Sequence, residues 1–535
     1  MFVNNELLLK NNYLLLVVKK IVVFSYTKFI IGLLGENMKN FIVERIKYYA
    51  NYYGNNIAIV FNEHKISYKE LDYITDKYAD IILRKINYRR NVPIIIYRKR
   101  DHNFLLSIIS VIKAHCFYIP LESDTPVSRV HKICEKVNPA AVICDSENSE
   151  IMCNVIDVEL PIYDKNEPNT FYDVDISEED IVYVIFTSGT TGTPKGVKIS
   201  YSNLYNLIKS MYKIIYHEFD KKVNVGVMAS FNFDASVKQI FSSIYFGHTL
   251  VISDGSTRYF GRKIHNFHNK YNLKICDCTP THLQMMNMQK TDTPSLIPYL
   301  FVGGENLCWD TLYLYKKTFN YLPIIINVYG PTECCVDASY NFISKLPKNK
   351  SGNVAIGKPV NNTELVIIDE YGRIISELEK CGELVIVGSQ VGSGYYNEES
   401  KSFIKNSQGK NVAYKTGDLA KYISEKEIVI VSRLDNQVKI NGNRVELSEI
   451  SCVISDFIKL PCAVLLSNNK RYESNFLIAY IYGIKINKSE LIKYLKTVLP
   501  SYMIPSKFIA TDIWPLTQNG KLDEKRLRKI SGIEL

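Results

Sequence analysis

The sequence predicts an α/β protein whose large N-terminal domain is built from layers of helices and mainly parallel strands. Short runs rich in β-branched residues alternate with amphipathic stretches from about residue 40 to 435, which is the pattern of parallel sheets covered by helices. Residues 380–431 differ, because short strands follow one another across Gly turns and predict a small antiparallel subdomain. The end of the chain mixes strand and helix patterns and predicts a small α+β domain.

The expected elements are read from the period of the apolar residues. Strands of the large domain are expected at Ala58–Phe61, Val92–Tyr97, Ala140–Cys144, Ile181–Phe186, Val223–Met228, Thr249–Ser253, Pro323–Val328 and Leu365–Ile368. Helices are expected between them at Asn103–Lys113, Ser202–Tyr212 and Ser236–Phe246. The small C-terminal unit is expected to contain Ile428–Val431, Val445–Phe457, Pro461–Ser467, Phe476–Tyr482 and Lys488–Leu499.

Three segments divide the chain. A charged and amide-rich stretch at 433–437 places a domain boundary near Asp435, so we expect a core domain at 38–435 and a small domain at 436–535. Residues 1–37 are apolar and basic, and globular patterning begins just after Met38. We therefore expect the native protein to start at Met38, with residues 1–37 as an extension. The alternative is an amphipathic segment that lies on a membrane surface.

Composition excludes several classes of protein. The formal net charge of +10 is compatible with nucleic-acid binding, but Lys and Arg are spread along the chain beside 55 Asp and Glu residues, so we expect no nucleic-acid partner. No uncharged apolar run reaches the ~20 residues that a membrane-spanning helix needs. The 12 Cys residues are irregularly spaced and form no CxxC zinc pair, which predicts reduced thiols in a cytoplasmic protein.

One loop indicates phosphate binding. The predicted strand Val182–Phe186 runs directly into residues 187–196, TSGTTGTPKG. Glycines let the backbone approach an anion closely, hydroxyl groups donate hydrogen bonds, and Lys195 adds positive charge. The loop is not a Walker A motif, because Gly-Lys-Ser/Thr is missing. A general P-loop NTPase is therefore disfavoured.

This loop resembles the signature of the adenylate-forming superfamily, which comprises acyl-CoA synthetases, luciferases and adenylation domains of nonribosomal peptide synthetases. The resemblance covers about residues 40–525, and further motifs follow in the order of the family. They are ISYKEL at 66–71, KAHCFYIPL at 113–121, NVYGPTE at 327–333, GEL at 382–384, YKTGD at 414–418, RLDNQVKI at 433–440, LPSYMIP at 499–505 and NGKLD at 519–523. His115 and Cys116 depart from the small residues usual in the second motif, and Ser432 replaces the usual Gly.

The resemblance implies ATP and Mg²⁺ as co-substrate and metal. The phosphate loop would hold the β- and γ-phosphates through Thr187, Ser188, Gly189, Thr190, Thr191, Gly192 and Lys195. Thr332 would contact the α-phosphate and Glu333 would bind Mg²⁺, which prefers carboxylate oxygen. Tyr329 and Asn327 would contact adenine. Asp418 would accept hydrogen bonds from the ribose hydroxyls, and Arg433 would support the ribose.

Three residues near the end of the chain acquire roles by the same resemblance. Lys521 would bridge the carboxylate of the acid and the α-phosphate, and would neutralise the charge that develops as pyrophosphate leaves. Asp435 would be the hinge about which a mobile small domain rotates between adenylation and thioester formation, and Lys439 would lie on the moving face.

The segment Phe233–Ser236 favours the amino-acid-activating branch of the superfamily. Asp234 would pair with the α-ammonium group of the substrate, which simple acyl or aryl acids lack. A plainer interpretation makes Asp234 the N-cap of a helix that starts near Val237, and the two roles are compatible. An acyl- or aryl-acid CoA ligase remains the alternative within the superfamily.

Counting from these motifs places the substrate pocket at Asp234, Ala235, Lys238, Asp277, Phe301, Gly303, Val328, Val336, Asp337 and Lys521. Lys238 lies four residues after Asp234, so both share one side of a helix. A buried Lys needs a partner, and an acidic substrate would provide one, although Asp277 or Asp337 would serve instead. The set resembles that of glutamate-activating domains, so we expect L-glutamate, with glutamine, aspartate and α-aminoadipate as competitors.

The acceptor is the last expectation. No carrier or condensation domain is recognisable, so we expect a free-standing enzyme that passes the acyl group to a separate phosphopantetheinyl carrier protein, or less readily to CoA or to an amine. A non-catalytic nucleotide- or amino-acid-binding regulator is the alternative of a different class, and the presence of Lys521, Glu333 and Asp418 argues against it.

Overall fold

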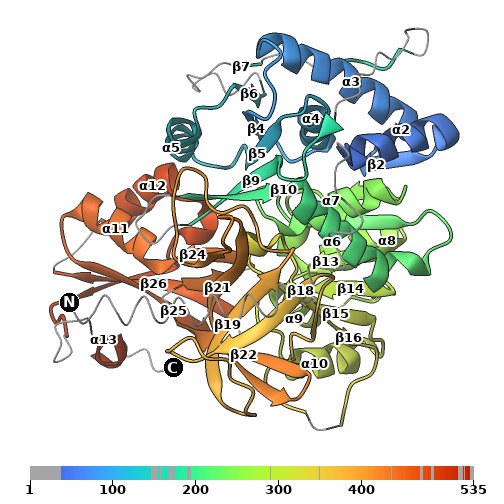
Figure 1. Ribbon diagram of the computed structural model, residues 1–535. Coiled ribbons are helices and arrows are strands. Elements are labelled where there is room, and N and C mark those ends of the chain that lie inside the picture. The colour runs from blue at the N-terminus through green and yellow to red at the C-terminus, as the bar shows by residue number, and fades with distance from the viewer. Residues whose placement is uncertain are drawn as a thin grey trace. The chain divides into compact units, whose positions relative to one another are not determined.

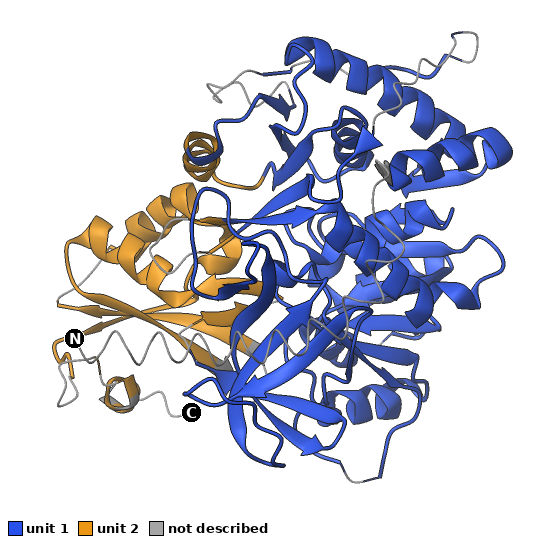
Figure 2. Cartoon of the chain, viewed as in Figure 1, with its two compact units in different colours: residues 1–123, 136–186, 196–434 blue, residues 124–135, 187–195, 435–535 orange. Residues whose placement is uncertain are grey.

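The computed structural model describes residues 38–145, 155–156, 160–164, 167, 175–188, 194–289, 291–348, 350–434, 437–440, 442–469, 474–483, 487–515, 522 and 524–530. The chain forms two compact units (Figure 2). Unit 1 comprises residues 1–123, 136–186 and 196–434, and unit 2 comprises residues 124–135, 187–195 and 435–535. The extension at 1–37 lies outside the described residues. The proposed domain limits stay a prediction.

The largest sheet of unit 1 has nine strands (Figure 1). Its order is β17-β16-β15-β14-β13-β11-β12-β2-β3, and the pairs from β15 through to β2 are parallel. The strands are β2 (Ile57–Phe61), β3 (His64–Ser67), β11 (Asn224–Val227), β12 (Thr249–Ile252), β13 (Leu273–Cys278), β14 (Tyr299–Val302), β15 (Ile324–Tyr329), β16 (Ser339–Ile343) and β17 (Lys358–Pro359).

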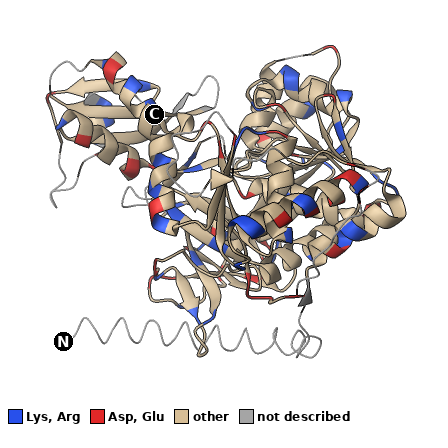
Figure 3. Cartoon of the chain, turned by 90° about the horizontal axis from the view of Figure 1, so that it is seen from above, with Lys and Arg blue, Asp and Glu red and all other residues tan. Residues whose placement is uncertain are grey.

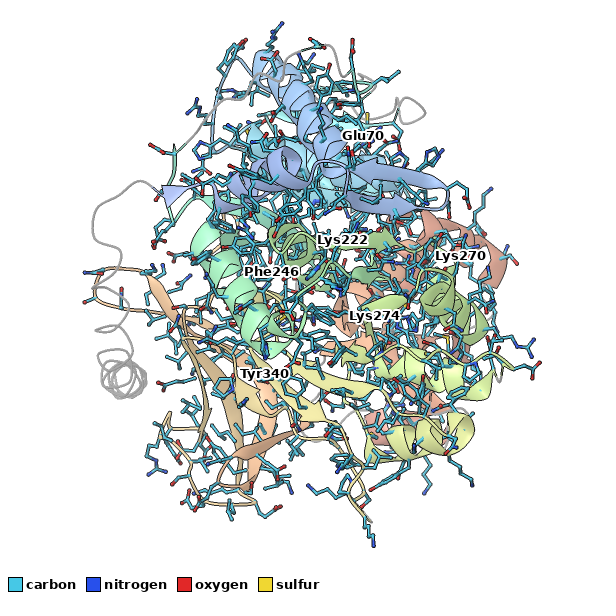
Figure 4. All side chains as sticks on the ribbon, turned by 90° about the vertical axis from the view of Figure 1, so that its right-hand side faces the viewer. Glu70, Lys222, Phe246, Lys270, Lys274 and Tyr340 are labelled. Carbon is cyan, nitrogen blue, oxygen red and sulfur yellow. The ribbon has the colours of Figure 1, made fainter. Side chains whose placement is uncertain are left out.

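Helices join the parallel strands of this sheet. They are α7 (Ala235–Tyr245), α8 (Gly261–Lys270), α9 (Pro280–Met288) and α10 (Trp309–Phe319). Helix α7 packs against β11 and β12, whereas α8 and α9 pack against β13. Phe246 follows the last residue of α7 (Figure 4). The expected strands and the helix at 236–246 are confirmed here, although α7 begins at Ala235, before the expected start near Val237.

A second sheet of unit 1 has six strands in the order β10-β9-β5-β4-β6-β7. The strands are β4 (Pro93–Arg98), β5 (Phe117–Glu122), β6 (Ala141–Cys144), β7 (Val155–Ile156), β9 (Ile181–Thr187) and β10 (Lys195–Ser200). The helices of this region are α2 (Phe41–Tyr53), α3 (Tyr68–Lys85), α4 (His102–Lys113) and α6 (Tyr201–Ile214). Helix α3 begins with a capping box in which Glu70 accepts from the Ser67 backbone N–H at 2.7 Å (Figure 4).

The antiparallel subdomain is confirmed as a five-stranded sheet. It contains β18 (Thr363–Ile368), β19 (Cys381–Gly388), β20 (Phe403–Lys405), β21 (Asn411–Ser424) and β22 (Glu427–Arg433). The segment at 428–431 was included both in this subdomain and in the C-terminal unit; the first expectation is confirmed and the second is wrong. It belongs to β22, which pairs antiparallel with β21. A turn at 425–426 folds the chain back on itself, so the two strands form one hairpin.

Unit 2 has its own apolar core, which includes Val445, Ile450, Leu477 and Leu495. Its elements are β23 (Gln437–Ile440), β24 (Asn443–Glu446), α11 (Leu447–Ile458), β25 (Cys462–Asn469), β26 (Ser474–Tyr482), α12 (Lys488–Val498), β27 (Lys507–Thr511) and α13 (Glu524–Ile530). Most of α5 (Val127–Val137) is also assigned to unit 2. The α+β character expected for this part of the chain is confirmed.

Acidic and basic residues are interspersed along the described chain (Figure 3). Within the described residues, every helix is too short or too polar to cross a lipid bilayer. The described cysteines are free thiols, and most of them are buried.

Candidate active site

The candidate site lies where the strand order of the nine-stranded sheet reverses. Strands β12 and β13 both come after β11 in the chain, but they pair with opposite edges of β11. At such a point the connections leaving adjacent strands diverge, and α/β proteins bind ligands there beyond the carboxyl ends of the strands. Asp234 lies in the segment after β11, and Asp277 is the penultimate residue of β13.

Neighbouring strands place further predicted residues at the same edge. Asp277 of β13 pairs in register with Phe301 of β14, and Val328 lies near the end of β15. Gly303 follows β14 and approaches Val328 so closely that an added Cβ would lie 2.7 Å from its Cγ2. The sheet therefore brings together residues that are far apart in the sequence.

The side chain of Lys238 is the centre of this group. Its ammonium nitrogen lies 2.9 Å from Asp277 Oδ2 and 2.7 Å from Asp337 Oδ2, and 4.4 Å from the centroid of the Phe301 ring. Only 3% of Lys238 is exposed. We call Lys238, Asp277, Phe301 and Asp337 the Lys238 cluster. The sequence left open whether Asp277 or Asp337 neutralises Lys238, and both carboxylates do.

Burial and charge act against one another in the cluster. Burial lowers the pKa of Lys238, but the two carboxylates raise it by more, so the ammonium stays charged. Burial raises the pKa of Asp277, and this effect exceeds the opposing effect of Lys238. With all three groups ionised the cluster carries one net negative charge. Asp277 is the carboxyl group that burial predisposes to take up a proton.

Asp234 and Ala235 begin helix α7. Asp234 occupies the N-cap position, but its side chain makes no capping hydrogen bond, so the N-cap interpretation is confirmed for the position alone. Asp234 and Ala235 are half-buried. Lys238 is one helical turn further along α7, as the four-residue spacing predicted.

The segment after β15 carries the predicted metal and α-phosphate residues. Thr332–Cys334 form a short 3₁₀ helix, and Glu333 is 1% exposed. The hydroxyl of Tyr395 donates a hydrogen bond to Glu333 Oε1 at 2.6 Å, which orients the carboxylate. Val336 and Asp337 complete this segment, and both are buried.

The predicted adenosine-binding residues form a second group beside this segment. The hydroxyl of Tyr329 donates to Asp418 Oδ2 at 2.5 Å, and Arg433 donates to Asp418 Oδ1 at 2.6 Å. Burial, and then the Asp418 charge, raise the pKa of Tyr329 far above its usual value, so it remains a hydroxyl. The Asn327 side chain donates to the Ala355 carbonyl at 2.9 Å, so this amide N–H is already used within the fold.

Only the two ends of the phosphate loop are described. The Thr187 hydroxyl donates to the Lys195 carbonyl at 3.5 Å. The Ser188 hydroxyl donates to the Arg444 carbonyl at 3.0 Å and accepts from the Glu446 backbone N–H at 3.1 Å, all within unit 2. Gly189, Thr190, Thr191, Gly192, Asp435 and Lys521 lie outside the described residues, so their predicted roles are not placed.

Sequence reasoning missed the residues that hold the segment before Asp234. Buried Arg100 donates to the carbonyls of Val227 and Ala229 at 3.0 and 2.8 Å. Glu122 accepts from the Phe231 backbone N–H at 2.7 Å. No local pattern marks these contacts, because Arg100 follows β4 and Glu122 ends β5 in one sheet, whereas their partners lie at or just after the end of β11 in the other.

The fold is shared with known adenylation structures. The chain superimposes on holo-PA1221, an NRPS protein containing adenylation and PCP domains, with a TM-score of 0.75 and 21% identity over 91% of this chain and 84% of that one. Residues 46–396 match the family model of the AMP-binding enzyme. The chain belongs to the AMP-binding enzyme family.

Two of the curated relatives are much longer proteins, and this chain matches one part of each. The chain is 33% identical to bacitracin synthase 1 of Bacillus licheniformis over 486 residues, which is 89% of this chain and 9% of that protein. It is 32% identical to surfactin synthase subunit 1 of Bacillus subtilis (strain 168) over 484 residues, or 88% of this chain and 13% of that protein. The chain thus spans about a tenth of the length of these relatives.

Proposed function

We propose that this chain activates an amino acid as an aminoacyl adenylate. A carboxylate oxygen of the amino acid attacks the α-phosphorus of ATP, an oxygen–phosphorus bond forms, and the bond to pyrophosphate breaks. The products are aminoacyl-AMP and pyrophosphate. The observation that carries the proposal is the position of Asp234 and the Lys238 cluster, which lie at the strand-order reversal of the same unit that holds Tyr329, Glu333 and Asp418.

The nucleotide is proposed to bind along the segment that ends β15. Tyr329, Asp418 and Arg433 form a preassembled group in which the carboxylate is already oriented by two donors. Such a carboxylate suits the two ribose hydroxyls, which would compete with or replace the present donors. Thr332 is proposed to contact the α-phosphate, while Thr187, Ser188 and Lys195 mark the ends of the proposed phosphate loop.

The described residues suit an Mg²⁺ ion that binds together with ATP. No group of three or more His, Cys, Asp or Glu residues suited to a metal exists among the described residues. Mg²⁺ in nucleotide sites typically uses one or two carboxylates together with phosphate oxygens, and does not need a cage made of protein alone. Buried Glu333, oriented by Tyr395, is proposed as that carboxylate. The bound ion would supply positive charge at the phosphates.

Asp234 is proposed to bind the α-ammonium group of the substrate. Its side chain is not used to cap α7, although it stands at the N-cap. A half-buried carboxylate beside the Lys238 cluster would select α-amino acids over simple acyl or aryl acids, because only the former bring a compensating charge. Lys521 is proposed to bind the α-carboxylate and the α-phosphate.

We favour L-glutamate as the amino acid. Its side-chain carboxylate would replace Asp277 as one of the two partners of Lys238, and Asp277 would take up a proton and donate a hydrogen bond to it. The net charge of the group would then remain minus one, as in the ionised cluster without substrate. Ala235, Gly303, Val328 and Val336 are proposed to line the remainder of the substrate site.

The adenylate is proposed to pass to the thiol of a phosphopantetheinyl carrier protein. The thiolate attacks the acyl carbon, a thioester forms, and AMP leaves. Support comes from the similarity to bacitracin synthase 1 and to a structure that contains adenylation and PCP domains. Asp435 is proposed as the hinge between the two half-reactions, with Lys439 on the moving face.

Exchange of labelled pyrophosphate into ATP, measured with each proteinogenic amino acid and α-aminoadipate, tests the proposal. Strong exchange with glutamate is expected. Strong exchange with a neutral amino acid would keep adenylation and refute the assignment of glutamate. Exchange driven only by acyl or aryl acids would instead favour a CoA ligase.

A further inference from the structure

A strained backbone turn presents Asp337 to Lys238. Val336 has a φ of +73°, and the Asp337 backbone N–H donates to the Cys335 carbonyl at 3.1 Å, so residues 335–337 form a γ-turn with positive φ. Cys335 itself has a φ of +48°. Positive φ is unfavourable for a β-branched residue such as Val, so the surrounding structure must hold this turn in place.

Two backbone features hold the turn on one side. The Ala338 N–H donates to the Tyr329 carbonyl at 2.8 Å. Gly330 passes so close that an added Cβ would lie 2.1 Å from the Val336 carbonyl oxygen, so only Gly fits there. These contacts fix the part of the turn that follows Val336.

A buried side chain holds the other side. Gln390 is 0% exposed, and its Nε2 donates to the Cys335 carbonyl at 2.7 Å. This is the same carbonyl that closes the γ-turn by accepting from Asp337. Gln390 follows β19 and touches the turn from a different part of unit 1.

Gln390 is itself held by the side-chain amides of other residues. Asn206 of α6 donates to Gln390 Oε1 at 2.6 Å and to the Asn361 carbonyl at 2.8 Å. The side-chain amide of Asn362 donates to Asn206 Oδ1 at 3.1 Å. Because an amide has a distinct donor end and acceptor end, this chain of hydrogen bonds leaves the Gln390 donor directed at Cys335.

We propose that Gln390 is a positioning residue that sets amino-acid affinity and selectivity through the γ-turn at Val336. Gln390 fixes the Cys335 carbonyl, the carbonyl fixes the turn, and the turn delivers the Asp337 carboxylate to Lys238. The inference rests on the proposed adenylation of an amino acid. It adds a specificity-determining residue that lies outside the sequence motifs named above.

The test compares Gln390→Met with the wild-type chain in pyrophosphate exchange. Met has a similar volume and lacks both the donor and the acceptor. We expect the KM for glutamate to rise about tenfold, the ratio of glutamate to glutamine exchange to fall, and the KM for ATP to stay within about twofold. A purely structural role would instead lower the folded fraction and leave both KM values unchanged.

Gln390→Glu and Asn287→Leu complete the set. Gln390→Glu keeps the acceptor for Asn206 but removes the amide donor to Cys335, so it should reproduce the rise in glutamate KM. Asn287 donates to the Thr311 carbonyl at 3.3 Å and is the control for loss of a buried amide elsewhere, with unchanged selectivity expected.

The outcomes separate the two proposals. Unchanged glutamate KM and selectivity in both folded Gln390 variants overturn the inference alone, and so does failure of both variants to fold. Absence of amino-acid-dependent exchange in the wild-type chain overturns the proposed function, and the inference with it.

Discussion

The ammonium group of Lys238 is hydrogen-bonded to Asp337 at 2.7 Å, although 99 residues separate the two in the sequence. Asp277 approaches the same nitrogen at 2.9 Å from a third part of the chain. A buried Lys with two ionised carboxylates carries a net charge of minus one before any substrate binds. The proposed recognition of glutamate would therefore require exchange of one carboxylate partner of Lys238 and uptake of a proton.

Replacing Lys238 with Gln should abolish the preference for glutamate. Removal of one member of a buried ionic group costs about 3–5 kcal/mol because the remaining charges are left uncompensated. We expect the kcat/KM of glutamate-dependent exchange to fall about a hundredfold or more, with a smaller fall for glutamine. The double variant Lys238→Gln with Asp277→Asn restores the net charge of minus one and should favour glutamine. Retention of glutamate preference by the single variant would contradict the assignment.

The preference for glutamate over glutamine should weaken as pH rises. Burial raises the pKa of Asp277, and the proposed complex with glutamate contains one more proton than the separate reactants. By linkage, glutamate binding is then favoured at low pH and weakens above the pKa of Asp277, by at most about tenfold per pH unit. Glutamine needs no such proton. The ratio of the two kcat/KM values measured across pH should show this slope, and Asp277→Asn should remove it.

Acid should destabilise unit 1 through buried histidines. Burial lowers the pKa of His248, His265 and His282 to about 4 and that of His268 to about 3. Unfolded His titrates near about 6.5, so the unfolded chain takes up protons below that pH while the folded chain does not. Stability is fully present above about pH 6.5 and is lost as the pH falls toward 4.

Urea denaturation at a series of pH values measures this loss. His268→Gln should make the decline between pH 6.5 and 4 shallower, because one of the four groups is removed. An unchanged decline in that variant would show that other groups cause the acid sensitivity. Exposed His217, replaced with Gln, is the control and should leave the decline unaltered.

Lys113 should be important for stability and not for substrate choice. Its ammonium lies 2.7 Å from Asp72 Oδ1 and 2.6 Å from Asp76 Oδ1, and it joins α3 to α4 in a buried position. Lys113→Met should lower the free energy of unfolding by about 3–5 kcal/mol, because two carboxylates lose their buried partner. Lys380→Met breaks an exposed pair with Glu377 and should cost less than about 1 kcal/mol.

Denaturant unfolding of both Lys variants measures these differences, and exchange per folded molecule should be unchanged in each. Equal stability of the two variants would contradict the prediction that the buried ion pairs of Lys113 stabilise the fold more than the exposed pair of Lys380. A change of substrate preference in Lys113→Met would contradict its purely structural assignment.

Much of the fold follows from local sequence patterns. Apolar runs located β9, β11, β12 and β15, and a 3.6-residue period located α7, because each pattern depends on burial of one face of one element. The segment at 428–431 was assigned to two units at once, since nothing local distinguishes a strand of the five-stranded sheet from a strand of the C-terminal unit.

The site was only partly predictable for a similar reason. Helical spacing placed Lys238 beside Asp234, and motif spacing singled out Asp277 and Asp337. The sequence did not reveal that both carboxylates contact Lys238, because that depends on strand register and on a turn. The β-branched residue Val336 would not be predicted at the turn, since such residues avoid positive φ. No sequence pattern singled out Gln390.

Pyrophosphate exchange into ATP by the wild-type chain with Mg²⁺, measured amino acid by amino acid, tests the central claim most directly. The account predicts exchange that depends on an amino acid, strongest with L-glutamate, and a loss of about 10²–10³-fold in Lys521→Ala. Absence of exchange with every amino acid, from folded protein that binds ATP, would contradict it.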